Sequence, residues 1–331
     1  MSEAMIQVEN LTKDYGPFRA VDSVSFNVRK GEVLGFLGPN GAGKSTTMKI
    51  LTCFLAPTGG IAKVAGLDVY EHSLEVRKRI GYLPEDTPLY RDMTVLEYLE
   101  FCAEVRGMPR DRRQTRIREV GGRCGLGDVA GKLIGELSKG FRQRVGLAQA
   151  MVHDPDIVIL DEPTSGLDPN QIVEIRDLIR EVGREKTVIL STHILPEVQA
   201  TCSRMIIINK GKVVADGTPD ELRARERGAR HRVVIEVPKN GTGLMRDSEA
   251  TSLIRDRLQA VEGVNRCDAA AGEPGAVAFH VYATTSGDVR KEIFNAVVAN
   301  KWTLLELGRE SASLEDVFRS LTTTSAEESR I

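Results

Sequence analysis

A glycine-rich loop between an apolar segment and an amphipathic segment constrains this chain more than any other feature. Residues 33–37 form a continuous apolar run, and residues 44–55 have helical spacing that stops before Pro57. This order predicts a buried strand, a loop and a helix. The loop matches the pattern G-x-x-x-x-G-K-[ST] in full. Its residues are Gly38, Pro39, Asn40, Gly41, Ala42, Gly43, Lys44 and Ser45.

A loop of this kind is suited to holding a polyphosphate. Glycines let successive backbone N–H groups face one anion at the N-terminus of a helix, where the helix dipole favours negative charge. Lys44 is placed to reach the β and γ phosphate oxygens, the Ser45 hydroxyl to ligate Mg²⁺, and Thr46 follows in the first helical turn. The alternative is a glycine-rich turn that binds nothing, which would make Lys44 and Ser45 coincidental.

Two carboxylates follow a second apolar run. Residues 157–160 lead directly into Asp161 and Glu162. Open α/β sheets bind ligands at the carboxyl ends of their strands, so we expect both side chains to lie near the glycine-rich loop. Asp161 is the candidate Mg²⁺ ligand through water, and Glu162 the candidate general base for an attacking water. A buried strand that ends in a solvated acidic pair is the structural alternative. These features alone leave kinase, GTPase, helicase and transport ATPase open.

The hydrophobic pattern predicts two domains. Residues 1–225 read as an α/β domain with a mixed, mainly parallel sheet, a small antiparallel β subdomain near the N-terminus and a helical insertion at about residues 86–155. Residues 226–331 have the order β-α-β-β-α-β, which predicts a small α+β domain of the ferredoxin-like type. The two domains are joined by a polar, arginine-rich segment.

Composition and charge exclude several classes of protein. The 45 Lys and Arg against 47 Asp and Glu give a net charge of -2, so we expect no direct nucleic-acid partner. No apolar run reaches the roughly 18 residues that a membrane span needs, and the first residues do not resemble a secretion signal, which favours the cytosol. The cysteines lack metal-ligand or Cys-x-x-Cys spacing and are expected to be reduced thiols. They are Cys53, Cys102, Cys124, Cys202 and Cys267.

Residues 137–144 resemble the signature of the ABC ATPase superfamily. They contain Ser138 and Gly140 at the start of a helical segment, 17 residues or more before Asp161. Other family marks follow in the family's order: Tyr15 resembles the aromatic residue that stacks on adenine, residues 165–168 resemble the loop at the dimer interface, and His193 resembles the switch histidine that contacts the γ-phosphate. Taken singly, Ser138 would be a helix cap, Tyr15 a core residue and His193 structural. The resemblance covers residues 5 to about 225.

Within this superfamily, residues 81–85, 137–144 and 311–318 are most similar to the ATP-binding subunits of gliding-motility and multidrug exporters. The chain departs from the family pattern at two positions. Glu85 stands where the family usually has Gln, and Lys139 where it usually has Gly. A carboxylate at residue 85 is still a candidate Mg²⁺ ligand through water, whereas Lys139 adds a cation and a Cβ to the signature loop.

The resemblance implies a head-to-tail homodimer with ATP and Mg²⁺ held between the Lys44 loop of one subunit and the Ser138 loop of the other. It also implies a separate transmembrane permease and a place on the cytoplasmic face of the membrane. Two alternatives remain: an ABC ATPase that acts on a ribosome or DNA, and a regulatory module that binds ATP without turnover. The six arginines in residues 106–118 would face the permease or anionic lipid, or form a solvated face paired with Asp111 and Glu119.

Overall fold

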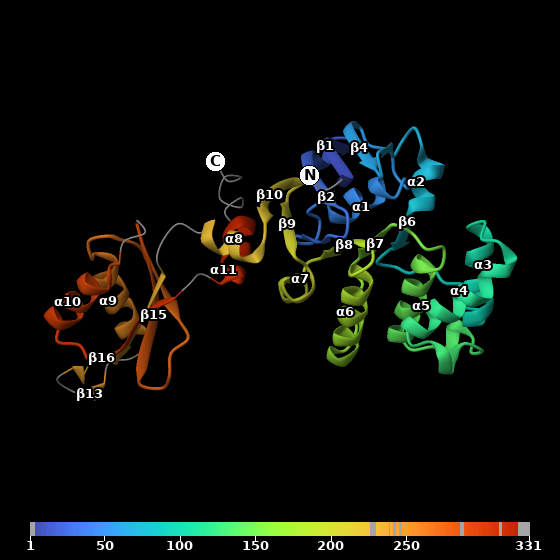
Figure 1. Cartoon of the computed structure of the whole chain (residues 1–331). Helices are drawn as coiled ribbons and strands as arrows, with labels where there is room; N and C mark the ends of the chain where they lie inside the picture. Colours follow the sequence, from blue (N-terminus) through green and yellow to red (C-terminus); the bar gives the residue numbers. More distant parts are fainter. Residues whose placement is uncertain are drawn as a thin grey trace. The chain divides into compact units, whose positions relative to one another are not determined.

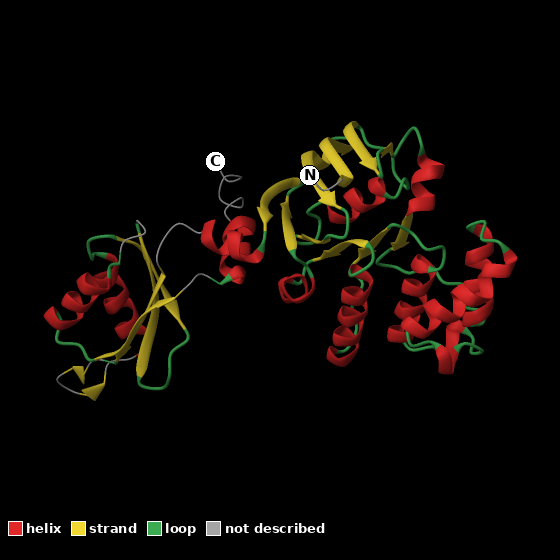
Figure 2. Cartoon of the chain, in the orientation of Figure 1, coloured by secondary structure: helices red, strands yellow, loops and turns green. Residues whose placement is uncertain are grey.

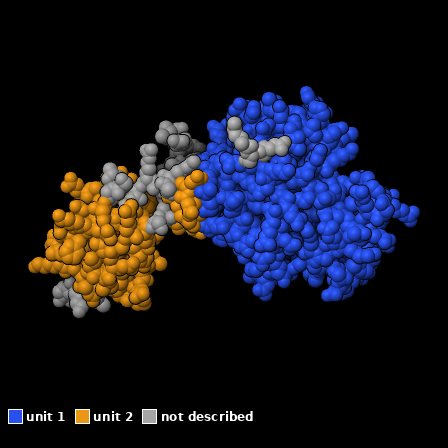
Figure 3. All heavy atoms as spheres, viewed as in Figure 1, with its two compact units in different colours: residues 1–219, 318–331 blue, residues 220–317 orange. Residues whose placement is uncertain are grey.

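The computed structural model describes residues 4–225, 230–237, 239–240, 243–244, 247–284, 288–310 and 313–323. The chain divides into two compact units, which Figure 3 colours separately. The first unit comprises residues 1–219 and 318–331, and the second comprises residues 220–317.

A six-stranded sheet forms the centre of the first unit (Figures 1 and 2). Five strands are parallel, and one edge strand, β10, pairs antiparallel with its neighbour. Because helices cover both faces of a parallel sheet, its strands read as continuous apolar runs rather than alternating ones. In sheet order the strands are β10 (Lys212–Gly217), β9 (Arg204–Asn209), β3 (Val33–Leu37), β8 (Thr187–Thr192), β7 (Ile157–Asp161) and β6 (Ile80–Leu83).

An antiparallel sheet of four strands packs against the central sheet. Its two long strands run further than the alternating segments 6–8 and 24–28 indicate, because register shifts along the β1–β2 pair let the strands continue past interruptions in the pattern. Phe26 of this sheet and Phe36 of the central sheet have ring centroids 5.5 Å apart within one hydrophobic core. In sheet order the strands are β2 (Phe18–Arg29), β1 (Ala4–Tyr15), β4 (Gly59–Val64) and β5 (Leu67–Asp68).

The remaining helices of this unit connect the strands. The helix after β3 ends earlier than residue 55, because Cys53 has a left-handed φ of 60° and the N–H of Phe54 bonds back to the carbonyl of Lys49. None of the described helices combines the length and apolar character needed to cross a bilayer. The helices are α1 (Lys44–Leu51), α2 (Ser73–Arg79), α6 (Pro169–Gly183) and α7 (Leu195–Thr201), with α8 (Pro219–Arg225) at the boundary of the two units.

A helical region lies between β6 and β7, within the expected insertion of residues 86–155. Thr94 begins it with a capping box, in which its hydroxyl accepts from the N–H of Glu97 and the Glu97 carboxylate accepts from the N–H of Thr94. Its helices are α3 (Val95–Val105), α4 (Arg110–Arg123), the short 3-10 helices η1 (Gly127–Val129) and η2 (Ile134–Glu136), and α5 (Lys139–Met151).

Two of the six arginines in residues 106–118 are bound within this region. Arg113 forms ion pairs with Glu100 and Glu104, and Arg116 with Glu119 and Asp154. The expected pairing with Glu119 is therefore present, while the ion pairs of the described residues give Asp111 no partner. The side chain of Arg116 is only 16% exposed, so this arginine holds α4 in place rather than facing solvent.

The second unit is an antiparallel sheet covered on one face by two helices. The strand order places the first strand between the third and the fourth, as the split β-α-β-β-α-β arrangement requires. In sheet order the strands are β14 (Val264–Ala270), β15 (Ala276–Ala283), β11 (Arg230–Glu236) and β16 (Leu304–Glu310), with a small pair β12 (Lys239–Asn240) and β13 (Gly243–Leu244) beside them in the chain. The helices α9 (Asp247–Gln259) and α10 (Arg290–Ala299) share one core with the strands.

The last helix, α11 (Leu314–Thr323), leaves the second unit and ends in the first. The expected division assigned all of residues 226–331 to the accessory domain, whereas the structure groups residues from 318 onward with residues 1–219. The Nδ2 amide of Asn209 donates to the carbonyl oxygens of Leu321 and Thr322, at 3.3 Å each. Asn209 is only 7% exposed, so these bonds satisfy a buried amide and fix the end of the helix to the first unit.

A pair of phenylalanines tests the core of the second unit. Phe279 is fully buried, whereas Phe294 is 50% exposed. Phe279→Ala should lower the free energy of unfolding of this unit by about 3–5 kcal/mol, and Phe294→Ala by less than about 0.5 kcal/mol. Urea unfolding followed by the fluorescence of Trp302, the one tryptophan of the chain, measures both, because its side chain packs against this core. Equal losses from the two substitutions would contradict the assigned core.

Candidate active site

The glycine-rich loop connects β3 to α1 and is shaped by positions that only glycine tolerates. Gly41 and Gly43 have left-handed φ values of 78° and 103°. A Cβ on Gly43 would lie 2.5 Å from the carbonyl oxygen of Ala20, and one on Gly38 would lie 2.3 Å from the carbonyl oxygen of Ile208. The chain therefore passes close to two neighbouring backbones here. No side chain caps the N-terminus of α1, so its first N–H groups are available to an anion.

Lys44 is buried beneath this loop, with 6% of its side chain exposed. Its Nζ donates to the carbonyl oxygens of Gly38 at 2.8 Å and Pro39 at 3.3 Å. The same Nζ lies 3.3 Å from Oε1 of Glu162, which is equally buried. A buried cation and a buried carboxylate are thus paired across the site, which offsets the cost of removing both from water.

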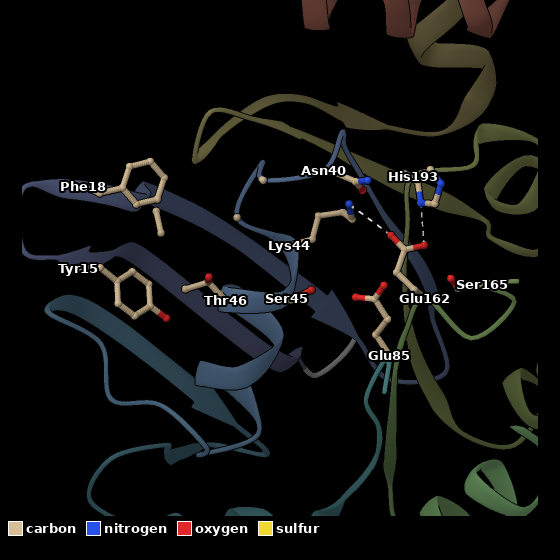
Figure 4. A pocket seen from close by; sticks show the side chains of 13 residues that line it. Tyr15, Phe18, Asn40, Lys44, Ser45, Thr46, Glu85, Glu162, Ser165 and His193 are labelled. Carbon is tan, nitrogen blue, oxygen red and sulfur yellow. Dashed lines mark hydrogen bonds and ion pairs between the residues drawn. The ribbon is translucent and has the colours of Figure 1, made fainter. Parts of the chain in front are cut away.

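Glu162 also contacts His193, which lies in the loop after β8. Its Oε2 lies 2.9 Å from Nδ1 of His193, and Figure 4 shows the carboxylate between Lys44 and His193. Glu162 has a left-handed φ of 50°, which is uncommon for a residue other than glycine. Glu162 lines the cleft, whereas its neighbour Asp161 lines an adjoining hollow. The strain is held by the hydrogen bond from the N–H of Glu162 to the carbonyl of Ser191.

Asp161 ends β7 as a buried carboxylate with 1% exposure. Burial raises the pKa of Asp161 above its usual range. The neighbouring hydroxyls of Ser191 and Ser45 and the Lys44 amine act against this rise, and the Glu162 carboxylate adds to it. Its Oδ1 has no hydrogen-bond partner among the described residues. An unsatisfied buried carboxylate oxygen is costly and is expected to meet a ligand, such as a cation or its water, in the working protein.

A cleft of about 440 Å³ brings most of the predicted residues together (Figure 4). Glu85 also lines it, with its side chain directed toward Glu162. The predicted residues on its wall are Tyr15, Asn40, Gly41, Gly43, Lys44, Ser45, Thr46, Glu85, Glu162 and His193. Gly38, Pro39 and Ala42 belong to the loop but do not line the cleft, and Asp161 lines an adjoining hollow together with Ser45 and Glu85.

Sequence reasoning missed two residues of this cleft, Phe18 and Ala20, and it named Ser165 only as part of the loop at the dimer interface. The Phe18 ring is 61% exposed and the Tyr15 ring 47% exposed, and both stand at the turn between β1 and β2. The available signal was a second aromatic residue close to Tyr15, since Phe18 follows the Gly16-Pro17 turn directly.

The signature residues lie elsewhere. Ser138 is the N-cap of α5, accepting from the N–H of Phe141 at 3.4 Å, and neither Ser138 nor Gly140 is on the wall of the cleft. A Cβ on Gly140 would lie 2.6 Å from the terminal amide of Gln171, a flexible side chain that can shift, so packing alone does not require glycine there. The Lys139 amine lies over Gly166, where an added Cβ would be 2.2 Å from it. Ser138 therefore does cap α5, as the structural alternative holds, and the signature residues lie at the N-terminus of this helix.

The residues present fit Mg²⁺ only if bound phosphates supply further oxygen ligands. In the described ranges, no group of three or more His, Cys, Asp or Glu is arranged to hold a metal ion. Ser45, Glu85 and Asp161 do line one hollow, and hydroxyl and carboxylate oxygens are the donors that Mg²⁺ prefers. Mg²⁺ is commonly bound by one or two carboxylates together with substrate phosphates, so a small protein donor set next to a phosphate loop is suitable.

Comparison with known proteins identifies the family. Residues 21–165 match the family model described as ABC transporter. The chain is 34% identical over 285 residues to the daunorubicin resistance ATP-binding protein DrrA3 of Streptomyces coeruleorubidus, an alignment that covers 82% of this chain and 90% of that protein. This chain belongs to the ABC transporter ATP-binding family. The expected fold and the expected ABC-type ATPase domain are thereby confirmed.

Two further matches show how far this ABC transporter ATP-binding chain extends along its relatives. It is 41% identical over 224 residues to the probable multidrug ABC transporter ATP-binding protein YbhF of Escherichia coli (strain K12), covering 67% of this chain. The chain spans 39% of the length of that relative. A solved dimeric structure of the ATP-binding cassette MJ0796, bound to ADP and Pi in a post-hydrolysis state, matches with a TM-score of 0.59 at 28% identity, covering 65% of this chain and 98% of that one.

The burial of Asp161 gives this ABC ATPase domain a pH-dependent stability. Because the folded state raises its pKa, the folded protein binds the proton more tightly than the unfolded chain, and stability falls as pH rises through the folded pKa. Nucleotide-free Asp161→Asn should therefore melt at a higher temperature than wild type near neutral pH. The difference should shrink as pH falls toward the ordinary aspartate pKa of about 3.9. Thermal unfolding across this range measures it.

Asp177→Asn is the matched control, because the side chain of Asp177 is 60% exposed and its removal should change stability by less than about 0.5 kcal/mol. A lower melting temperature for Asp161→Asn near neutral pH would contradict the account of this carboxylate.

Proposed function

We propose that this chain binds and hydrolyses ATP in the cleft formed by β1–β2, the glycine-rich loop and the ends of β7 and β8. The N–H groups of the loop and the Lys44 amine bind the β and γ phosphates, and the exposed rings of Tyr15 and Phe18 contact the adenine. The observation that carries this proposal is the Glu162 carboxylate bound at once to Lys44 and His193.

This arrangement places a proton acceptor next to the phosphate site. Lys44 contacts Glu162 in the nucleotide-free protein, so a triphosphate competes with Glu162 for the Lys44 amine. When Lys44 turns to the phosphates, the Glu162 carboxylate is released to accept the proton of an attacking water. His193, held at 2.9 Å from Glu162, contacts the γ-phosphate with its other edge. Bound Mg²⁺, held by Ser45 and through water by Asp161 and Glu85, would neutralise charge that develops on the phosphates.

The signature residues are absent from the wall of the cleft that one chain forms. We infer that a second copy supplies Ser138 and Gly140, so that two chains hold ATP head to tail. The N-terminus of α5 brings unpaired N–H groups and a favourable dipole to the γ-phosphate. Lys139 adds a positive charge there in place of a second signature glycine. The dimeric form of the MJ0796 cassette supports this proposal.

We propose that ATP hydrolysis by this dimer drives export through a transporter. The relatives include a daunorubicin resistance ATP-binding protein and a probable multidrug ABC transporter ATP-binding protein, which supports this proposal. We propose that the membrane-spanning part is a separate permease, and that the chain binds it on the cytoplasmic face of the membrane. The hollow beside Glu85, with the 78% exposed Phe54 on its wall, offers an apolar contact next to the helical region for that permease.

A ribosome- or DNA-bound ABC ATPase is the second candidate. Its partners are polyanions, which a chain with a net charge of -2 is poorly suited to bind. A regulatory module that binds ATP without turnover is disfavoured as well, because such a module would not need the Glu162 proton acceptor paired with His193.

Glu162→Gln separates binding from turnover. The amide keeps the shape of the side chain but accepts no proton, so ATP hydrolysis should fall by at least about 100-fold while ATP binding persists. The variant should then accumulate as an ATP-bound dimer. Light scattering measures the dimer, and a separate assay of phosphate release measures turnover. Glu185→Gln, on a side chain that is 52% exposed, should leave both readouts unchanged. A Glu162→Gln protein that stays monomeric with wild-type turnover would refute the proposed base.

A further inference from the structure

Glu197 is a buried carboxylate that the mechanism above does not use. It lies in the first turn of α7, four residues after His193, and is only 2% exposed. An ionised carboxylate without compensation is costly in such a position. Within the described part of the chain, two threonine hydroxyls donate to it: Thr164 Oγ1 to Oε1 at 2.5 Å, and Thr192 Oγ1 to Oε2 at 2.9 Å. The N-terminal turn of α7 adds a favourable dipole.

The two threonines come from the two loops that carry the proposed chemistry. Thr164 is two residues beyond Glu162, in a turn where the N–H of Ser165 bonds to the carbonyl of Glu162 at 3.1 Å. Thr192 immediately precedes His193. Each carboxylate oxygen of Glu197 therefore holds one of the two loops, the one after β7 and the one after β8.

Thr192 also accepts two hydrogen bonds from backbone N–H groups. Its hydroxyl accepts from the N–H of Ile194 at 3.1 Å, which fixes the turn at His193, while its carbonyl accepts from the N–H of Gly38 at 3.3 Å. The hydroxyl can accept from Ile194 because its own proton goes to Glu197. An acceptor with two oxygens is what this place requires, since both hydroxyls must donate in fixed directions.

We propose that Glu197 is a positioning residue for ATP hydrolysis, which sets the relative placement of Glu162 and His193 by binding Thr164 and Thr192. This inference rests on the proposed function of the site. Glu197 touches none of the groups that bind phosphate, so its loss should leave ATP affinity intact. It acts on the 2.9 Å contact between Glu162 and His193, and its loss should therefore lower kcat.

Glu197→Gln is the sharpest variant, because it keeps the side-chain volume and replaces one acceptor oxygen by a donor. One threonine hydroxyl then loses its acceptor. We expect kcat to fall about tenfold with the Kd for ATP within about twofold of wild type. Gln199→Ala, on the same helix and only partly buried, is the control and should leave kcat unchanged.

A double-mutant cycle with Thr164→Val separates positioning from general damage. If Glu197 acts through Thr164, the double variant should lose no more activity than the more affected single variant. Thermal unfolding of every variant, with Glu197→Ala included, is measured beside turnover. Unchanged kcat in Glu197→Gln and Glu197→Ala would overturn the inference, and so would equal losses of ATP affinity and kcat accompanied by a lower melting temperature. Absence of ATP turnover in the wild-type protein would instead overturn the proposed function, and the inference with it.

Discussion

The contact of the Glu162 carboxylate with Lys44 and His193 is the interaction on which the site depends. The three residues follow three adjacent parallel strands, β3, β8 and β7, whose register pairs Leu37 with Thr192 and Asp161 with Ser191. That register brings the strand ends to one edge of the sheet. Because Glu162 and Lys44 are both nearly buried, their pairing offsets part of the cost of removing each charge from water. A triphosphate that takes Lys44 from Glu162 therefore changes the charge balance of the whole site.

The same edge supports the proposal that two chains form one complete site. The phosphate loop, the carboxylates and His193 line a common cleft, while the signature residues cap a different helix and are absent from that wall. An anion held by one loop and a free helix N-terminus on another copy are complementary in charge. In the proposed dimer, ATP binds the paired form much more strongly than the single chain, so ATP binding would drive association and hydrolysis would allow dissociation.

Much of this arrangement could be predicted because local sequence determines it. The glycine-rich loop must follow a strand and open a helix, and the adjacent Asp161 and Glu162 must diverge at a strand end. The predicted order of strands and helices in the second unit is likewise found, since its hydrophobic periodicity is regular. Contacts between distant segments could not be predicted from such patterns. Glu197 reads as an ordinary polar helix residue until the fold places it between Thr164 and Thr192. The hydrogen bond from Asn209 to the end of α11 is likewise a contact between distant segments that no local pattern predicts.

The most direct test of the central claim mixes two inactive variants. Lys44→Ala disables the phosphate loop, and Ser138→Asp places a negative charge at the signature while keeping a good helix N-cap. Neither variant alone can form a complete site, but a mixed pair contains one site with an intact loop from one copy and an intact signature from the other. The account predicts that the mixture hydrolyses ATP while each variant by itself does not. A mixture as inactive as its components would contradict it.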